Sequence, residues 1–410
     1  FTENHVAVIR DWANTHNMKL RYQVYGNCME VTEASLASDI VETESWGHFD
    51  NKDMYRTQSG VVHMTSSNIY STESSAVKNL GWAQTWTGSH RSDKELDENG
   101  YYWPTDGTNY VYPGGDDNLA GADVINEDAG LLYHYNRELA TGVNRIVMHG
   151  FSYKSSLMQQ WPGDSFMSMA GFPNEWDDKT PMWNHIDQMT DYLARTQYVM
   201  QKGQADIDLA IYRKSNYERS EGFDWALNEL EKAGYTYDFA APALLDLDNA
   251  VTSTVNGKTV LAADGPSYKA LVLDQRYLVT EGQEKDGLTA SSMPVATAEK
   301  ILSYAKAGLP IVIVGEAPSK VGSFCGSDEA MNDENAKLAE IMAEIEALST
   351  TKIVATKDNV PAALSELGIS SDVQKDNDSA LLNFHRTDAD ADYYYLYNSD
   401  LNEEISQTIS

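Results

Sequence analysis

Hydrophobic and polar positions in the first half of the chain change repeatedly between a two-residue period and a helical period. Residues 19–25 alternate, which predicts a β-strand with one buried face. Residues 36–46 begin with small and apolar side chains that suit a buried strand. Residues 1–16 and 51–64 instead have apolar positions at helical spacing. Strands and helices that alternate in this way predict an α/β fold.

The alternation continues through the next 140 or so positions. Strand patterns return at residues 67–73 and 143–151, a further helix is predicted to start in residues 74–80, and helical patterns occupy residues 123–141 and 183–201. Long segments rich in Gly, Asp, Asn, Tyr and Trp follow the strands. Four strand-then-helix units with lengthened loops after the strands predict the C-terminal half of a (β/α)8-type barrel.

A second series of strands and helices starts at residue 205. Its predicted strands share short, continuous apolar runs and cover residues 207–212, 260–263, 270–274, 310–315 and 352–355. Predicted helices lie between them, which is typical of a doubly wound, flavodoxin-like sheet of parallel strands. No GxGxxG follows any of these strands, so the pattern does not predict nucleotide binding.

The last 35 residues change character again. Residues 381–385 and 393–397 are joined by an Asp-rich turn and predict a β-hairpin. We therefore expect three domains: a partial (β/α)8 catalytic barrel in residues 1–204, a doubly wound α/β domain in residues 205–375, and the start of a β-sandwich domain in residues 376–410.

The charge and composition narrow the class of partner. The 410 residues include 62 acidic and 30 basic side chains, for a formal charge of −32, which argues against nucleic acid as a partner. No run of 18 apolar residues is present, so a membrane-spanning segment is not expected. The acidic excess with 24 Tyr and 9 Trp is typical of secreted polysaccharide-degrading proteins. We expect a carbohydrate partner and an extracellular or periplasmic location.

Three glutamates are the candidate catalytic residues. Glu42 and Glu44 leave the same face at the C-terminal end of a predicted strand, where parallel folds build active sites. Glu73 ends the next strand, and Glu175 lies in the loop after the fourth. Glycoside hydrolysis requires two carboxyls that flank one bond, so Glu44, Glu73 and Glu175 are predicted to be catalytic. The alternative for each is an ordinary surface glutamate in an acidic chain.

Aromatic side chains and one histidine are the candidate contacts with a sugar. Aromatic rings offer the apolar faces on which sugars stack, and a histidine donates hydrogen bonds to hydroxyl groups. The predicted substrate-binding residues are Tyr25, Trp46, His149, Tyr153 and Trp176. In the alternative interpretation the aromatic residues pack loops onto the barrel and His149 is a hydrogen-bonded structural residue.

Several stretches resemble glycoside hydrolase family 106, the α-L-rhamnosidases. Asp39–Trp46 resembles the family's Asp-Val-Pro-x-Gly-Glu-Phe-Trp segment, and Ser71–Ser75 resembles the Ala-Glu-Ala-Phe segment that follows. Gly142–His149 resembles a Gly-Val-Asn-Arg-Phe-Val-x-His stretch. Tyr192–Gly203 resembles the helix that leaves the barrel, and Phe384–Arg386 resembles the start of the later β domains.

The resemblance implies a (β/α)8 catalytic barrel, an inverting and exo-acting α-L-rhamnosidase, and a calcium ion that helps to hold the rhamnose hydroxyls. Glu44, Glu73 and Glu175 match the family's acids, with the acid, base and metal-binding roles left open among them. The chain departs from the family motif at Val41, Thr43 and Ser45. These departures leave another deoxy sugar or a uronide as alternative substrates. The alternative function is that of a non-catalytic carbohydrate-binding or scaffold protein.

Overall fold

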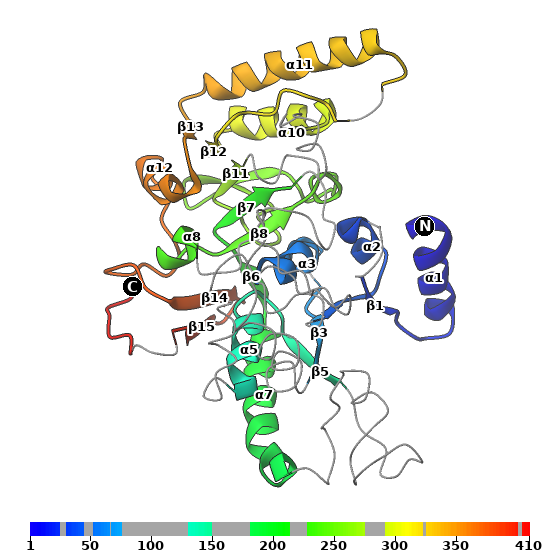
Figure 1. Ribbon diagram of the computed structural model, residues 1–410, viewed down its shortest axis with the longest axis vertical. Coiled ribbons are helices and arrows are strands. Elements are labelled where there is room, and N and C mark those ends of the chain that lie inside the picture. The colour runs from blue at the N-terminus through cyan, green and yellow to red at the C-terminus, as the bar shows by residue number, and fades with distance from the viewer. Residues whose placement is uncertain are drawn as a thin grey trace, which may run out of the picture.

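Four parallel strands form the N-terminal sheet of the computed structural model (Figure 1). The structure describes residues 1–24, 30–44, 52–65, 67–75, 130–149, 181–213, 228–274, 292–322, 325–400 and 404–410. The strands are β1 (Arg21–Gln23), β2 (Ile40–Glu44), β3 (Tyr70–Ser75) and β5 (Arg145–His149), and they pair in this order. Each lies within a predicted strand or overlaps it, and their parallel order is that of consecutive strands in a barrel.

Helices precede and follow these strands. They are η1 (Thr2–Val6), α1 (Ala7–Thr15), α2 (Val31–Leu36), α3 (Lys52–Met64), α5 (Gly130–Leu139), η4 (Pro181–His185) and α7 (Ile186–Met200). Helix α3 covers one face of the sheet, where the Tyr70 hydroxyl donates to the Tyr55 carbonyl at 2.6 Å. The prediction of a helix starting at residue 74 was wrong, because Ser74 and Ser75 belong to β3. Among the described residues, no helix combines the length and the hydropathy that a bilayer span needs.

The second sheet has five parallel strands. These are β7 (Leu209–Tyr212), β8 (Tyr237–Ala240), β11 (Ala270–Asp274), β12 (Ile311–Val314) and β13 (Thr351–Val354). They are ordered β13-β12-β11-β7-β8, which is the flavodoxin-like 2-1-3-4-5 order read from the other edge. Alternate side chains enter separate hydrophobic clusters: Leu271 belongs to one and Val272 to the other. Both faces of the sheet are therefore buried, as in doubly wound folds.

Helices cover this sheet on its two faces. They are α8 (Glu229–Lys232), α9 (Pro242–Leu245), α10 (Val295–Lys306), α11 (Asp328–Glu346) and α12 (Val360–Glu366), with the short η7 (Lys357–Asn359) before α12. Helices α10 and α11 supply Ile301, Leu338 and Ile345 to one cluster, and α12 supplies Leu364 to the other. Figure 1 shows α10 and α11 stacked at one end of the molecule.

One strand of the second sheet was predicted wrongly and one was missed. Residues 260–263 were expected to join the parallel sheet, but β10 (Lys258–Leu261) pairs antiparallel with β9 (Thr252–Val255) in a separate hairpin. The edge strand β8 was not predicted. It contains Asp238, and a charged residue within a four-residue run removes the apolar pattern that indicates a buried strand.

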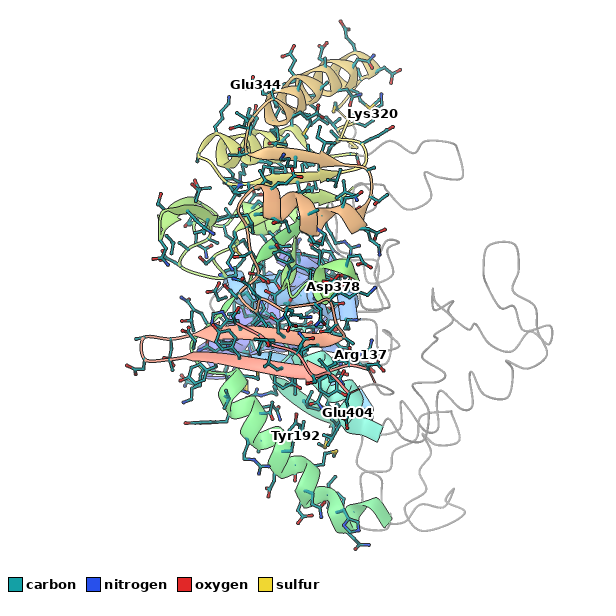
Figure 2. All side chains as sticks on the ribbon, turned by 90° about the vertical axis from the view of Figure 1, so that its left-hand side faces the viewer. Arg137, Tyr192, Lys320, Glu344, Asp378 and Glu404 are labelled. Carbon is teal, nitrogen blue, oxygen red and sulfur yellow. The ribbon has the colours of Figure 1, made fainter. Side chains whose placement is uncertain are left out.

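The C-terminal hairpin forms as predicted. Strands β14 (Leu381–Thr387) and β15 (Asp392–Asn398) pair antiparallel, and β14 also pairs with β6 (Gln204–Asp206), which was not predicted. The hairpin also contacts the helices, because the Tyr395 hydroxyl and the Tyr192 hydroxyl both donate to the side-chain oxygen of Asn136 on α5. Figure 2 shows Tyr192 on α7, beside this part of the molecule.

Helix α3 lies between the two large sheets (Figure 1). Gly60 permits this close approach, because a Cβ placed there would lie 2.5 Å from the Phe239 carbonyl oxygen of β8. We expect Gly60→Ala to lower the free energy of unfolding. Overpacking costs about 1–3 kcal/mol, and a contact of 2.5 Å with a backbone oxygen belongs in the upper part of that range, so the gain of about 1 kcal/mol in helix propensity offsets only part of the cost. Urea unfolding measures the change, and unchanged stability would contradict the close contact.

A buried charge network joins α3 to α8 and β8. The Arg56 guanidinium contacts Asp53 at 2.8 Å, Glu231 at 2.7 Å and the Tyr237 hydroxyl at 2.8 Å. The Lys52 ammonium lies 3.3 Å from the second oxygen of Glu231. All four ionisable side chains are at least nine-tenths buried. Burial alone would raise the pKa of Glu231, but the Lys52 and Arg56 charges outweigh it and bring that pKa down to about 2.

This network predicts a stability that falls in acid. Because the pKa of Glu231 is lower in the folded chain than its usual 4.5, its contribution is complete above about pH 5 and is lost as the pH falls towards 2. We expect the free energy of unfolding of the wild type to decrease more steeply over this range than that of Glu231→Gln. Urea unfolding at several pH values compares the two slopes, and parallel slopes would contradict this assignment.

Candidate active site

Two of the predicted acids lie side by side at one edge of the N-terminal sheet. Glu44 ends β2, and its Cα is paired in register with that of Glu73 on β3. Residues paired across parallel strands project to the same face, and their Cα atoms are separated by roughly the 4.8 Å strand spacing. Both side chains are partly buried. The two carboxylates therefore meet at the carboxyl ends of adjacent parallel strands, the edge at which α/β folds carry their catalytic groups.

Gln23 of β1 orients one of the two acids. Its side-chain amide donates a 2.9 Å hydrogen bond to Oε2 of Glu73, and the same nitrogen lies 3.5 Å from the Thr43 carbonyl oxygen. Gln23 is paired in register with Glu42, so it reaches diagonally across β2 to Glu73. The amide fixes the direction of the Glu73 carboxylate and leaves the Glu73 side chain on the same face as Glu44.

A buried polar layer supports the pair from below. Glu42 accepts a 2.7 Å hydrogen bond from the Ser71 hydroxyl and forms an ion pair with Arg21 at 2.9 Å. Burial raises the pKa of Glu42, although Ser71 and Arg21 favour the ionised form. Arg145 on β5 is paired in register with Ser71, which places a second cation in this layer. Next to the C-terminal ends of β2 and β3, this face of the sheet is therefore lined by polar side chains rather than by an apolar core.

The sequence predicted Glu44 and Glu73 as candidate acids but not the residues that contact Glu73 and Glu42, namely Gln23, Ser71 and Arg21. A signal was present, because the alternation of residues 19–25 places Arg21 and Gln23 together on one face, opposite the apolar face. Gln23 and Glu73 are 50 positions apart in sequence, and they meet because β1, β2 and β3 pair in this register. The register is a property of the assembled sheet and is not visible in any one of the three segments.

The structure describes only part of the predicted sugar-binding set. His149 ends β5, and its backbone pairs with Ser75, two positions beyond the Glu73–Val147 pair. His149 thus belongs to the same edge of the sheet as Glu44 and Glu73. The remaining predicted site residues lie outside the described residues: Glu175, Tyr25, Trp46, Tyr153 and Trp176.

Two carboxylates on adjacent parallel strands match the chemical requirement of a glycoside hydrolase site, and the comparisons with known proteins give the family. Residues 122–409 match the model of glycoside hydrolase family 106, described as alpha-L-rhamnosidase, and the chain belongs to this family. The resemblance stated from the sequence is confirmed. The match begins after Glu44 and Glu73, so these two residues lie outside the matched region.

The chain is also similar to three individual proteins. The solved structure of a rhamnosidase from Novosphingobium sp. PP1Y superposes with a TM-score of 0.61 at 16% identity, over 100% of this chain and 34% of that one, which shows a shared fold. A Formosa agariphila protein named "Putative beta-glucuronidase" is 22% identical over 275 residues, which are 67% of this chain and 19% of that protein. Gan42B, a GH42 beta-galactosidase, superposes at a TM-score of only 0.47 with 9% identity. The chain spans about a third or less of the first two relatives.

Proposed function

We propose that this chain is the part of an inverting, exo-acting α-L-rhamnosidase that carries the carboxyl-terminal strands of its (β/α)8 barrel. The observation that carries the proposal is the register pairing of Glu44 with Glu73 at the carboxyl edge of the N-terminal sheet. Membership of glycoside hydrolase family 106 supports the reaction type. The acidic composition supports an extracellular or periplasmic location for the enzyme.

The proposed mechanism uses two carboxyls on opposite sides of the glycosidic bond. The protonated one gives its proton to the leaving oxygen, while the ionised one takes a proton from a water molecule that attacks the anomeric carbon from the opposite face. Inverting pairs are separated by roughly 6.5–9.5 Å, which exceeds the roughly 4.8 Å between adjacent strands. We therefore propose that Glu175 and one of the strand-end glutamates form this pair, and that the other glutamate binds substrate or metal.

The family resemblance also implies a calcium ion, and the donor chemistry of this edge fits one. Ca²⁺ prefers carboxylate and carbonyl oxygens, and Glu44 and Glu73 supply carboxylate oxygens on adjacent strands. When bound, calcium would hold and orient sugar hydroxyls. Gln23 would keep the Glu73 carboxylate directed towards this edge through its hydrogen bond.

The substrate is the second part of the proposal. We propose an α-L-rhamnoside, and the "Putative beta-glucuronidase" similarity makes a β-glucuronide the competing substrate. The test compares release of the aryl group from aryl α-L-rhamnoside and aryl β-D-glucuronide by the full-length protein. Faster release from the rhamnoside supports the proposal. Faster release from the glucuronide, or sugar binding by calorimetry without turnover over days, would contradict it.

A further inference from the structure

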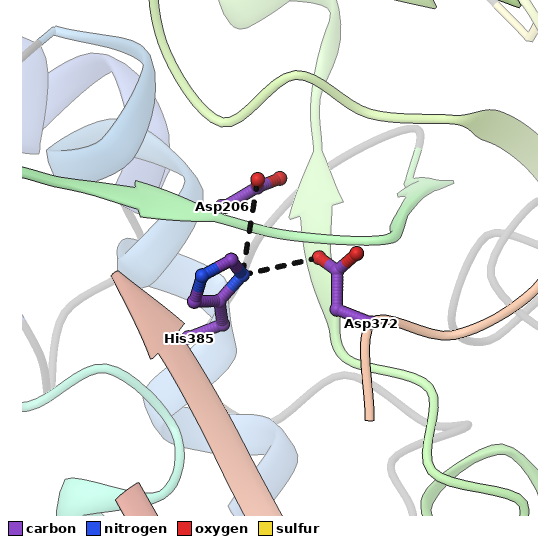
Figure 3. A group of neighbouring side chains, drawn as sticks. All are labelled: Asp206, Asp372 and His385. Carbon is purple, nitrogen blue, oxygen red and sulfur yellow. Dashed lines mark hydrogen bonds and ion pairs between the residues drawn. The ribbon is translucent and has the colours of Figure 1, made fainter. Parts of the chain in front are cut away.

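A second group of ionisable side chains lies where three distant segments meet, away from the edge that carries Glu44 and Glu73. Asp206 is the last residue of β6, Asp372 lies in the segment after α12, and His385 belongs to β14 (Figure 3). Nδ1 of His385 lies 3.2 Å from Oδ2 of Asp372 and 3.8 Å from Oδ2 of Asp206. One ligand atom from each residue lies within 4.8 Å of the other two.

These separations suit a small divalent cation. With metal–ligand distances of about 2.0–2.2 Å, neighbouring ligands of a tetrahedral ion lie about 3.3–3.6 Å apart. The distances from Nδ1 of His385 to the two aspartates, 3.2 and 3.8 Å, bracket that range. One imidazole nitrogen with two carboxylate oxygens is a donor set for Zn²⁺ rather than for Ca²⁺, which takes six to eight oxygens.

The surrounding groups have the arrangement that supports metal ligands in proteins. The second ring nitrogen of His385 lies 3.3 Å from Oδ1 of Asp392, and a ligating histidine characteristically holds a carboxylate on its other nitrogen. The second carboxylate oxygen of Asp372 accepts a hydrogen bond from the Lys269 ammonium at 2.5 Å, while Oδ2 remains directed at His385. Tyr394 stacks on the imidazole at 4.3 Å between ring centroids and fixes its plane.

The cluster also has more negative than positive charge. The four carboxylates of Asp206, Asp208, Asp372 and Asp392 face Lys269 and His385 as the cations among the described residues. Lys269 forms ion pairs with Asp208, at 2.6 Å, and with Asp372. Among the described residues, the Asp206 carboxylate makes no side-chain hydrogen bond, and its ion-pair contact is with Nδ1 of His385 at 3.8 Å. A bound cation would compensate this excess.

We propose that Asp206, Asp372 and His385 form a binding site for a divalent cation of the Zn²⁺ class. The ion would link β6 and β14 to the segment that follows α12, and would therefore stabilise the contact between the C-terminal hairpin and the domain of the five-stranded sheet. Such a site is structural, since it lies on different strands from the paired glutamates.

The test is calorimetric titration of the full chain with Zn²⁺, and separately with Ca²⁺, after treatment with a chelator. We expect Zn²⁺ to bind at one site more tightly than Ca²⁺, and to raise the thermal unfolding midpoint. Asp206→Asn and His385→Gln should each weaken Zn²⁺ binding at least tenfold. Asp392→Asn changes a side chain that is 57% exposed, so the variant should fold, and it should weaken binding by about 10–100-fold.

The control is His5→Gln, which removes an exposed histidine from η1 and should leave Zn²⁺ affinity unchanged. Circular dichroism verifies that each variant is folded. The proposal is overturned if the wild type binds no Zn²⁺, or if folded Asp392→Asn and Asp206→Asn bind Zn²⁺ like the wild type; either result would identify the cluster as an ion-pair network of His385 with Asp372. Ca²⁺ binding that is as tight as Zn²⁺ binding and is lost in Asp206→Asn would overturn the preference for Zn²⁺, whereas Ca²⁺ binding that Asp206→Asn leaves unchanged belongs to another site.

Discussion

Glu44→Gln and Glu73→Gln are each expected to lower kcat for an aryl α-L-rhamnoside by about 10²–10⁴-fold. In the glutamate that pairs with Glu175, the amide keeps the size of the side chain but neither gives nor takes the proton that the reaction moves. In the other glutamate, the amide removes the negative charge that would hold substrate or metal. The two residues are paired in register at the same strand ends, so both losses should occur in one site. Initial rates of the full-length protein measure the effect, and the same test applied to Glu175→Gln examines the third acid.

The matched control for these substitutions is Glu340→Gln, which changes an exposed residue of α11 and should keep wild-type kcat. The leaving group separates the roles. A variant that lacks the acid should recover most of its rate on a substrate whose aryl alcohol is strongly acidic, because little protonation is then needed. A variant that lacks the base should not recover. Wild-type kcat in both Glu44→Gln and Glu73→Gln would remove the paired strand-end acids from the mechanism.

The largest expected effect on stability comes from Arg56→Met. Removing the guanidinium leaves the carboxylates of Asp53 and Glu231 buried without their principal cation, which typically costs about 3–5 kcal/mol. The apolar replacement fills similar volume, so the loss reflects charge rather than a cavity. Urea unfolding followed by circular dichroism gives the change in the free energy of unfolding.

Two controls make that result specific. Arg10→Met removes an arginine whose ion pair with Asp11 is exposed, and should change stability little. The double variant Arg56→Met/Glu231→Gln should recover part of the loss, because the amide removes the uncompensated charge. A destabilisation equal to that of Arg10→Met would mean that the network does not hold α3 against β8.

Much of the architecture follows from local sequence patterns. The alternation of residues 19–25 and the apolar residues before Glu44 predicted β1 and β2, and the continuous apolar runs predicted β7, β11 and β12. These signals are local, because a strand that is buried on one or both faces requires a matching arrangement of its own side chains.

The missed strands lack such a signal. β6 consists of Gln204, Ala205 and Asp206, and it is a strand only because β14, about 180 positions later, pairs with it. β8 contains Asp238, whose burial is satisfied by hydrogen bonds from Ser59 and Tyr268 in other elements. Neither pairing is visible in a short stretch of sequence, because the partners are brought together by the fold.

In the candidate site, too, some features follow from local sequence and others depend on the assembled sheet. Its acids were predictable, since carboxylates at the ends of consecutive parallel strands meet at one edge. The hydrogen bond from Gln23 to Glu73 and the support of Glu42 by Ser71 and Arg21 depend on register across the sheet. A shift of one residue would turn these side chains to the other face.

A crystal structure of the full-length Glu73→Gln variant soaked with an α-L-rhamnoside would show where the sugar binds. We expect a sugar at the carboxyl ends of β2 and β3, within hydrogen-bonding distance of the side chains at positions 44 and 73. A rhamnoside bound elsewhere, with those two side chains contacting no sugar, would contradict this expectation.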